Sequence, residues 1–438
     1  MNLFRGRGLS MYWKQSYYFR DYLRSSLWIV PFIAIPFELV ATRLLHRLDG
    51  WLGWAFLDVG ASGAQAMFNA IVTATLSFIV FTFGSLLVAL QVASGQLTPR
   101  IIATVLVRNN VVRYTTGLFI FTLLFAISAL NKMQGSVFQL VVFVGACLGI
   151  ACIAAFLFLI DYAARLLRPI SIVGLVGKAG LTVIESVYPD PSLGPRQSDS
   201  QRFKLGTPAR TIDHRGTSEI ILATNITELV AEAEKSDGVI EFVPQVGDFI
   251  ATDEPLFNLY GGAASLDDGD LMSTVAFGPE RTLKQDPTFA FRIIVDIALK
   301  ALSPAINDPT TAVIAIDQLH RLLRTAGNKN LRTDEILSKS GQLVVIFRTP
   351  NWEDFVHLAF TEIRQCGVQN MQIARRLRAM IENLIQTLPK HRHPPLQQQL
   401  QLVDREIEQC FRNPEDLALA RMGDAQGLGG ASSIERMR

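Results

Sequence analysis

Four long apolar segments occupy the first 165 residues of the chain, and a longer polar region follows them. The stretch of residues 71–93 contains no Asp, Glu, Lys or Arg, and it exceeds the ~20 apolar residues that cross a hydrocarbon core of ~30 Å. The other three segments lie at about residues 27–45, 112–130 and 137–160. The pattern therefore predicts an α-helical membrane domain of four transmembrane helices over residues 26–165.

The second of these spans has two faces of small or polar residues. At 3.6 residues per turn, Thr73, Ser77 and Gln91 share one face, and Thr75 and Thr82 lie nearly opposite. Such faces commonly pack against neighbouring helices, because small and hydroxylated residues let helices approach closely. A polar path through the membrane is the alternative, and for it we take Thr73, Ser77 and Gln91 as pore-lining candidates.

Glu38 is an acidic residue within the first predicted span. An ionisable group at membrane depth is a functional candidate, and a carboxylate near the outer mouth of a path could select or coordinate a cation. The alternative is an interfacial carboxylate paired with Arg43 or Arg47. Glu38 therefore joins the pore-lining candidates with this second interpretation left open.

Basic residues are unevenly distributed around the four spans. They gather before the first span, between the second and third, and after the fourth: Arg5, Arg7, Lys14, Arg20, Arg24, Arg100, Arg108, Arg113, Arg165, Arg168 and Lys178. Loops rich in Lys and Arg tend to stay on the cytoplasmic side. We therefore predict a multi-pass protein of the bacterial inner membrane, in contact with the lipid bilayer, with both termini in the cytoplasm and residues 1–25 as a basic, aromatic segment.

The charge and cysteine content of the chain bear on its nucleic-acid, metal and disulfide chemistry. Charged residues make up 18% of the chain and the formal net charge is +2, so we expect no nucleic-acid partner. The four cysteines form no CxxC pair, which gives no zinc site or disulfide framework. The acidic run at residues 266–270 fits a solvated turn, and His391 and His393 in a basic, Pro-rich loop lack further ligands nearby. We expect no metal and no cofactor.

The polar half divides by pattern. Residues 166–216 are interpreted as a linker and connecting segment, because 186–210 are rich in Pro, Gly and Ser. Strand patterns fill residues 217–265, and the strand pair that ends on PLFNLYGG resembles the barrel-sandwich module of lipoyl and biotinyl domains, without a Lys at the hairpin tip. Residues 266–422 predict a helical α+β domain, and the composition of 423–438 predicts a disordered tail.

Residues 281–312, RTLKQDPTFAFRIIVDIALKALSPAINDPTTA, contain two helix starts and the corner between them. Asp286-Pro287 and Asp308-Pro309 each place a capping Asp before a Pro at the first helical position. Two capped helices with a surface salt-bridge row explain the pattern. The alternative is a polar ligand or coupling site, for which the candidates are Arg281, Asp286, Arg292, Asp296, Ser303, Asn307, Asp308 and Thr310.

Three segments in the same order carry a family resemblance: ASGQLTPR at the end of the second span, GDFIATDEPL, and the run from residue 281 to 312. Together they resemble the predicted bacterial membrane protein family known only as a domain of unknown function, number 2254. The ALSPAINDPTTA run is the most specific part. The resemblance implies an integral membrane protein with a cytoplasmic C-terminal half, and it implies no reaction.

These observations predict an α-helical membrane protein of four transmembrane helices, with a cytoplasmic α+β domain that contains a small β-barrel or sandwich-like module. The leading functional hypothesis is a homo-oligomeric ion channel or transport protein for a small ion or molecule, regulated by the cytoplasmic domain. The alternative is a membrane-anchored enzyme, or a ligand-binding or scaffold protein, with its site at the corner of residues 303–311. We assign no catalytic residue, because residues 281–312 contain no His or Cys.

Overall fold

The computed structural model describes residues 13–20, 22–23, 26, 28–52, 59–96, 110–133, 137–166, 168–188, 205–331 and 334–430. The described chain divides into two compact units. The helical unit consists of the described residues between 22 and 95 and between 110 and 172, and the C-terminal unit consists of residues 13–20, Gln96 and the described chain from Val173 on. Predicted features at residues 1–12, 97–109, 189–204 and 431–438, including Arg100 and Arg108, lie outside the described residues.

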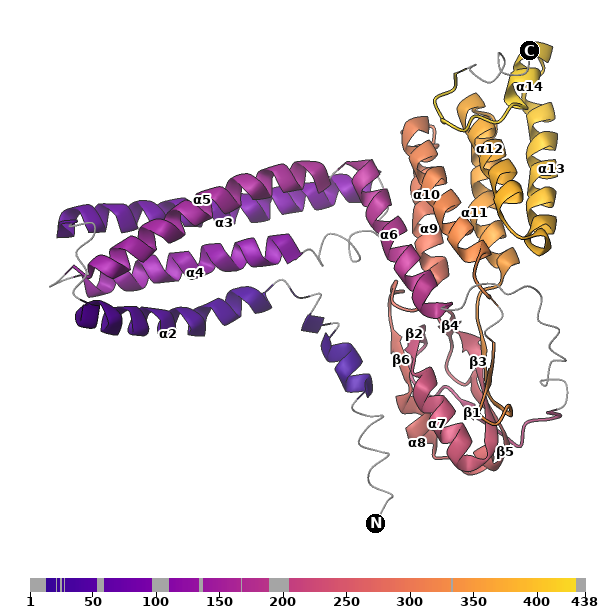
Figure 1. Ribbon diagram of the computed structural model, residues 1–438, viewed down its shortest axis with the longest axis horizontal. Coiled ribbons are helices and arrows are strands. Elements are labelled where there is room, and N and C mark those ends of the chain that lie inside the picture. The colour runs from indigo at the N-terminus through magenta and orange to yellow at the C-terminus, as the bar shows by residue number, and fades with distance from the viewer. Residues whose placement is uncertain are drawn as a thin grey trace. The chain divides into compact units, whose positions relative to one another are not determined.

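The helical unit consists of four long helices that run side by side (Figure 1). They are α2 (Ile29–Leu52), α3 (Ala61–Gln96), α4 (Asn110–Lys132) and α5 (Gln139–Leu166), one for each predicted apolar segment. The helices approach closely at glycines, since a Cβ on Gly145 would collide with the ring of Phe68 and one on Gly117 with Val30. The four predicted helices are therefore confirmed as helices of sufficient length and hydrophobicity to span a membrane.

The helical unit exposes apolar side chains and buries polar ones. Val80, Leu87 and Ile150 are about two-thirds exposed, at 67%, 67% and 68%, whereas Thr75 is 1% and Thr122 0% exposed. Water would penalise this arrangement, but lipid tails would not, and buried hydroxyls can bond to helix carbonyls. The distribution is that of a unit surrounded by hydrocarbon.

A fifth helix, α6 (Pro169–Val187), is also long and apolar enough to span a membrane. It occupies part of the segment 166–216 that the sequence pattern interprets as a linker and connecting segment. From Val173 on, α6 belongs to the C-terminal unit, where Gly180 lies against Ala290 and Leu322. Its apolar side therefore has protein partners, which local composition does not reveal.

The C-terminal unit contains two open sheets. The larger has the strand order β1 (Arg210–Asp213), β5 (Pro255–Gly261), β3 (Gly238–Gln245), β8 (Leu343–Arg348) and β7 (Glu335–Leu337), and the smaller has the order β4 (Phe249–Ile250), β2 (Glu219–Thr224) and β6 (Val275–Gly278). All pairs are antiparallel except β3 with β8.

The predicted β-barrel or sandwich-like module at residues 217–265 is wrong. Strand β3 does pair with β5 as a hairpin-like neighbour, but its other edge pairs with β8, where Ile240 lies opposite Val345. The strand pair is thus the middle of a larger sheet, and β2 and β4 belong to the other sheet. Neither sheet closes on itself among the described strands. The local pattern could not indicate β8 as the partner of β3, because β8 lies about 100 residues further along the sequence.

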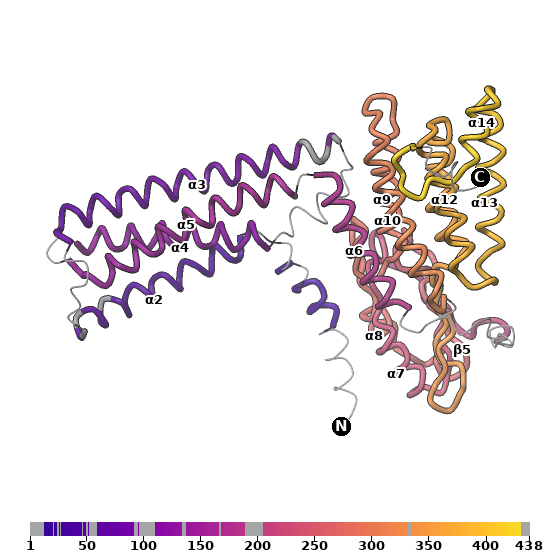
Figure 2. Tube along the Cα trace, turned by 45° about the horizontal axis from the view of Figure 1, so that its top comes forward, coloured from indigo at the N-terminus to yellow at the C-terminus, as the bar shows by residue number. Residues whose placement is uncertain are grey.

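Helices fill the rest of the C-terminal unit (Figure 2). They are α7 (Ile226–Ser236), α8 (Asp268–Ser273), α9 (Pro287–Ala301), α10 (Pro309–Gly327), α11 (Trp352–Gly367), α12 (Met371–Thr387), α13 (His393–Cys410) and α14 (Pro414–Ala420), with short 3₁₀ segments at Gly262–Ser265 and Lys390–Arg392. Apolar stripes on these helices form the core, with Ile294, Leu319 and Phe360 fully buried. The α+β class of this region is confirmed.

Residues 423–430, predicted as part of a disordered tail, are held by the side chain of Arg375. Arg375 is fully buried and donates hydrogen bonds to the carbonyls of Met422, Gly429 and Gly430 at 3.0, 3.1 and 2.9 Å. A buried guanidinium requires such acceptors. Composition alone does not show that Arg375 binds these carbonyls.

Candidate functional site

The pore-lining candidates of α3 lie on the outer surface of the helical unit. Thr73 and Ser77 are exposed, and their hydroxyls donate to the carbonyls of Asn69 and Thr73, both at 2.9 Å. Gln91 is exposed on the same face, whereas Thr75 and Thr82, on the opposite face, are 1% and 2% exposed. The buried face therefore packs inside the unit, and the Thr73 face is the free one.

Glu38 lies apart from that face. Its side chain is 2% exposed and accepts a hydrogen bond of 2.6 Å from the hydroxyl of Thr42, one turn further along α2. The structure thus gives Glu38 a buried position with a hydroxyl partner. Within one chain, Glu38 and the exposed face of α3 do not line a common surface.

Asp286 caps the start of α9 in a buried position. Its Oδ1 accepts hydrogen bonds from the hydroxyl of Thr288 at 2.5 Å and the backbone N–H of Phe289 at 3.1 Å. Its Oδ2 has no hydrogen-bond partner in the described part of the chain, and Nη1 of Arg281 is 4.0 Å away. Burial raises the pKa of Asp286, and the contacts with Thr288 and Arg281 oppose that rise.

Asp286 also marks the meeting point of two segments that are distant in sequence. Gly247 forms a tight turn with φ of +97°, and a Cβ there would collide with Oδ2 of Asp286. Beside it, Gln285 accepts from the backbone N–H of Thr224 at 2.9 Å and donates to its carbonyl at 3.3 Å. Residues 285 and 286 therefore join α9 to the turn after β3 and to the end of β2.

Arg292 and Asp296 form a salt-bridge cluster on the next turns of α9. The guanidinium of Arg292 donates through Nε to Asp296 at 2.7 Å and through Nη1 and Nη2 to the two carboxylate oxygens of Glu362 at 2.6 and 2.9 Å. This bidentate contact lowers the pKa of Glu362. Glu362 lies on α11, and the sequence pattern gave no signal for it.

The corner between α9 and α10 uses its polar groups internally. Asn307 has φ of +46° and donates from its backbone N–H to the carbonyl of Ser303 at 2.8 Å. The hydroxyl of Ser303 donates to the carbonyl of Lys300 at 2.7 Å. Asp308 accepts from the backbone N–H of Thr311 at 3.1 Å and from its hydroxyl at 2.5 Å, while Thr310 is exposed. This is the geometry of a capped turn.

The candidates of the segment 281–312 do not gather at this corner. Helix α9 has 15 residues, so about 22 Å separate its two ends at 1.5 Å per residue. Asp286 and Arg281 lie at one end, and Ser303, Asn307 and Asp308 lie beyond the other. The candidates in the segment 281–312 therefore form one group at the start of α9 and another beyond its end, with the Arg292 cluster between them.

The family model described as "Predicted membrane protein (DUF2254)" matches residues 24–383. The chain belongs to this family. The DUF2254 match contains α2 to α11 and most of α12, and so includes both ends of α9.

Two relatives extend the comparison for this DUF2254 protein. "Uncharacterized protein Rv1290c" of Mycobacterium tuberculosis and "Uncharacterized protein Mb1321c" of Mycobacterium bovis are each 26% identical to the chain over 422 residues, which cover 91% of the chain and 79% of the relative. No solved structure matches the chain. The comparisons describe a membrane protein and name no reaction.

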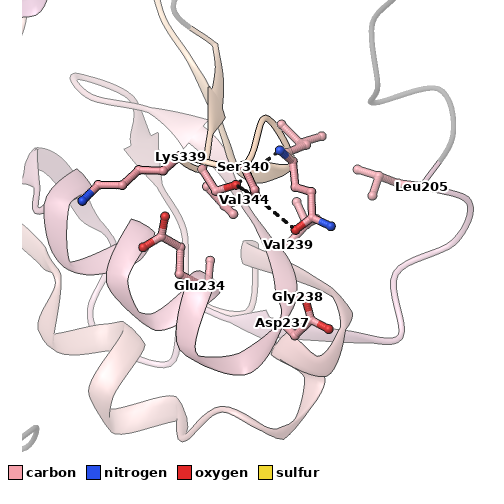
Figure 3. A pocket seen from close by; sticks show the side chains of 12 residues that line it. Leu205, Glu234, Asp237, Gly238, Val239, Lys339, Ser340 and Val344 are labelled. Atoms are coloured by element: carbon pink, nitrogen blue, oxygen red, sulfur yellow. Dashed lines mark hydrogen bonds between the residues drawn. The ribbon is translucent and has the colours of Figure 1, made fainter.

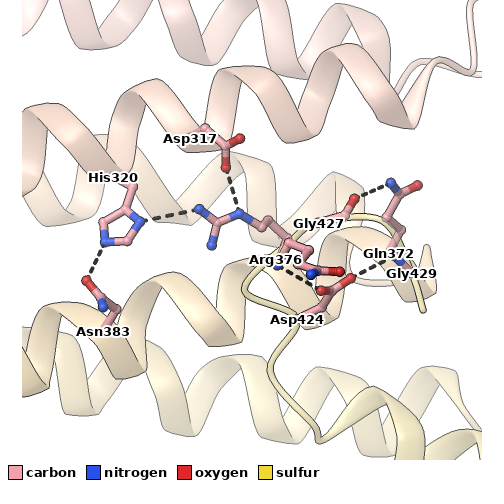
Figure 4. Close-up of polar contacts among 9 residues, drawn as sticks. Asp317, His320, Gln372, Arg376, Asn383, Asp424, Gly427 and Gly429 are labelled. Carbon is pink, nitrogen blue, oxygen red and sulfur yellow. Dashed lines mark hydrogen bonds and ion pairs between the residues drawn. The ribbon is translucent and has the colours of Figure 1, made fainter. Parts of the chain in front are cut away.

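One further polar cluster of this DUF2254 protein was absent from the sequence prediction (Figure 4). His320 of α10 contacts Asn383 through Nε2 at 2.9 Å and Arg376 through Nδ1 at 3.3 Å, and Arg376 donates to Asp317 at 2.7 Å. Burial and the charge of Arg376 lower the pKa of His320. The cluster joins α10 to α12, and its members are too far apart in sequence for a spacing rule to group them.

The C-terminal unit also has a cavity of about 700 Å³ between α7, β3 and the β7–β8 hairpin (Figure 3). Glu234, Asp237 and Lys339 are its charged lining residues, and the hydroxyls of Ser338 and Ser340 lie 2.7 Å apart. None of the sequence-predicted site residues lines it. In the described part of the chain, no group of three or more His, Cys, Asp or Glu side chains is placed to hold a metal ion.

Proposed function

We propose that this DUF2254 protein is a homo-oligomeric channel or transport protein of the inner membrane, in which the exposed face of α3 lies between copies or along a polar path. The observation that carries the proposal is the exposed row of Asn69, Thr73, Ser77 and Gln91 on α3, whose other exposed residues between 69 and 91 are apolar. An amide exposed to hydrocarbon lacks hydrogen-bond partners, at a cost of several kcal/mol. A second copy or a water-filled path removes that cost.

The hydroxyls and the amide on this face differ in their need for further hydrogen-bond partners. Thr73 and Ser77 already donate to carbonyls of their own helix, so lipid would tolerate them. Gln91 carries two donors and an acceptor on a long side chain. Gln91 is therefore the residue whose replacement should report most directly on an assembly or a path along α3.

In this proposal α2 to α5 cross the membrane, α6 does not, and both termini lie in the cytoplasm. Tyr18 precedes α2 and hydrogen-bonds to Phe277 of β6, which follows α6 in the chain. Both residues belong to one folded unit, so an even number of helices must cross between them. The packing of α6 on Ala290 and Leu322 supports the same assignment, and the basic loops favour the cytoplasm for this side.

Ion flux through proteoliposomes tests the transport part, with Gln91→Leu beside Thr82→Val as the matched control. Thr82→Val removes a polar group from the buried face of the same helix. We expect flux in the parent protein, a several-fold change with Gln91→Leu, and little change with Thr82→Val. Absence of flux across several cations, anions and voltages would reject transport.

Cross-linking in membranes tests the assembly separately. In a variant lacking the four native cysteines, Ser77→Cys should form a disulfide between copies, whereas Leu157→Cys on the apolar outer surface of α5 should not. A monomeric protein in lipid, with no Ser77→Cys dimer, would reject the homo-oligomer.

Labelling tests the membrane orientation. A maleimide that cannot cross the membrane is applied to right-side-out vesicles in which the only cysteine is Phe19→Cys or Cys410. We expect neither to react until the membrane is opened. Reaction of one and not the other from outside would show that an odd number of helices crosses.

The alternative of an enzyme or ligand site at the corner of residues 303–311 has less support. The Ser303 hydroxyl bonds to the last turn of α9, and the Asp308 carboxylate bonds to Thr311, so both groups already have partners.

A further inference from the structure

The helix of residues 13–20 is bound to the edge of the smaller sheet of the C-terminal unit. The hydroxyl of Tyr18 donates to the carbonyl of Phe277 at 2.8 Å and accepts from its backbone N–H at 2.9 Å. Phe277 lies in β6, the edge strand of the order β4-β2-β6. One side chain thus satisfies both backbone groups of a residue at an open sheet edge.

Aromatic and cationic contacts complete this docking. Trp13 and Tyr17 pack against the buried side chains of Leu222, Ala223 and Ala276. The ammonium of Lys284 lies 3.9 Å from the centroid of the Tyr17 ring, within the range of a cation–π interaction. Lys284 immediately precedes Gln285, so the segment that joins β2 to α9 also contacts the N-terminal helix.

The C-terminal unit therefore holds the chain on both sides of the four-helix segment, but with different strength. On the far side, α6 contributes Val173, Val176 and Ile184, which are 0% exposed. On the near side, every residue from 13 to 20 is half-buried or exposed. Burial of apolar area is the main source of docking energy, so α6 is the fixed attachment and the N-terminal helix is the releasable one.

We propose that the helix of residues 13–20 is a strap through which the C-terminal unit regulates the helical unit, by holding or releasing the start of α2. This inference rests on the proposed function for its effect on transport, but the docking and its reach into α2 can be measured without transport. A change at β2, β6 or Lys284 would be transmitted because each of them contacts the strap directly.

Hydrogen exchange of the full-length protein in lipid tests the strap. Tyr18→Phe removes both hydrogen bonds to Phe277 and keeps the ring, and Tyr114→Phe removes a hydroxyl from the exposed surface of α4 as the control. We expect exchange to accelerate roughly ten-fold in peptides covering residues 13–23 and in the peptide at the start of α2, as loss of one or two net hydrogen bonds predicts. Peptides of α6 should not change.

The outcomes are separable. Faster exchange confined to residues 13–23, with the start of α2 unchanged, would overturn the strap, as would unchanged exchange at residues 13–23. If the parent protein shows no ion flux, the transport proposal fails while the exchange result still decides the strap. If flux is present, Tyr18→Phe and Lys284→Met should change it in the same direction, and Tyr114→Phe should leave it unaltered.

Discussion

The two Asp-Pro helix starts of this chain have the same local pattern and different surroundings. Asp286 and Asp308 each cap a helix through the backbone N–H three residues on, and each also accepts from a threonine hydroxyl. Asp286 is 2% exposed, and its second carboxylate oxygen faces Gly247 without a hydrogen bond in the described chain. Asp308 is half-buried and uses both oxygens on Thr311.

The difference shows that a capping motif specifies where a helix begins but not what else the cap does. Among the described residues, the carboxylate of Asp308 bonds within its own helix start. Asp286 serves a helix start and a junction of α9 with the turn at Gly247, next to the Gln285 contact with β2. We therefore expect substitutions at the Asp286 junction to affect the whole C-terminal unit, and substitutions at the Asp308 corner to remain local.

The largest effect is expected for Gly247→Ala. The change forces an L-residue into φ of +97° and places a methyl group on the Asp286 carboxylate, so the free energy of unfolding should fall by about 3 kcal/mol. Gly341→Ala is the matched control, because Gly341 has φ of +84° but open space around its Cβ position, and it should cost only about 1 kcal/mol. Urea unfolding of the C-terminal unit within the full chain, monitored by pulse proteolysis, measures the loss of stability in both variants.

A double variant sharpens this prediction. If the carboxylate is the obstacle, Gly247→Ala combined with Asp286→Ala should lose less stability than the sum of the two single variants. Equal effects of Gly247→Ala and Gly341→Ala would mean that the contact with Asp286 contributes nothing.

The next largest effect separates the two caps directly. Asp308→Ala should cost about 1 kcal/mol, the usual loss of an N-cap, and Asp286→Ala about 2 kcal/mol, because the buried helix start loses its cap and its packing against Gly247. Asp286→Asn should retain more stability than Asp286→Ala, because burial disfavours the charge but not the cap. The same unfolding assay at pH 7 applies, and equal losses for the two Ala variants would remove the distinction.

The same distinction, between features set by local sequence and features set by distant partners, separates what could be predicted from what could not. The four long apolar segments and both Asp-Pro starts follow from local rules, because a span needs only length and hydrophobicity and a cap needs only its own turn. The pairing of Ile240 with Val345 and the contact of Gly247 with Asp286 depend on distant partners. Local patterns cannot identify such partners, so the open sheets and the junction were missed.

The sequence pattern does not indicate helix α6 for a related reason. Its apolar side is matched by Ala290 and Leu322, and with Lys178 in its middle its own sequence is typical of neither a clean span nor a clean linker. The same limit applies to the polar residues. The place of Glu38 in an apolar segment makes it a candidate, but its hydrogen bond with Thr42 and the cluster around His320 cannot be predicted from local sequence.

A smaller effect concerns His320, a half-buried side chain that has partners at both ring nitrogens, whereas one oxygen of the Asp286 carboxylate has none among the described residues. Its pKa is lowered in the folded protein, so the unfolded chain binds the proton more readily, and stability should fall as pH drops below the unfolded value of about 6.5. His320→Asn should remove that part of the slope between pH 7.5 and 5.5 in the unfolding assay. A slope unchanged by the substitution would show that His320 does not contribute to it.

The smallest effect is expected at the exposed corner, where Asn307→Gly relieves a left-handed backbone at φ of +46°. Since Asn tolerates this region better than most residues, the gain in stability should be only about 0.5 kcal/mol. The same variant removes the Asn307 side chain, so it also tests the corner as a ligand or coupling site. A stabilised protein with unchanged flux would identify the corner as a turn, whereas a stabilised protein with lost flux would assign the side chain a role that its backbone geometry does not explain.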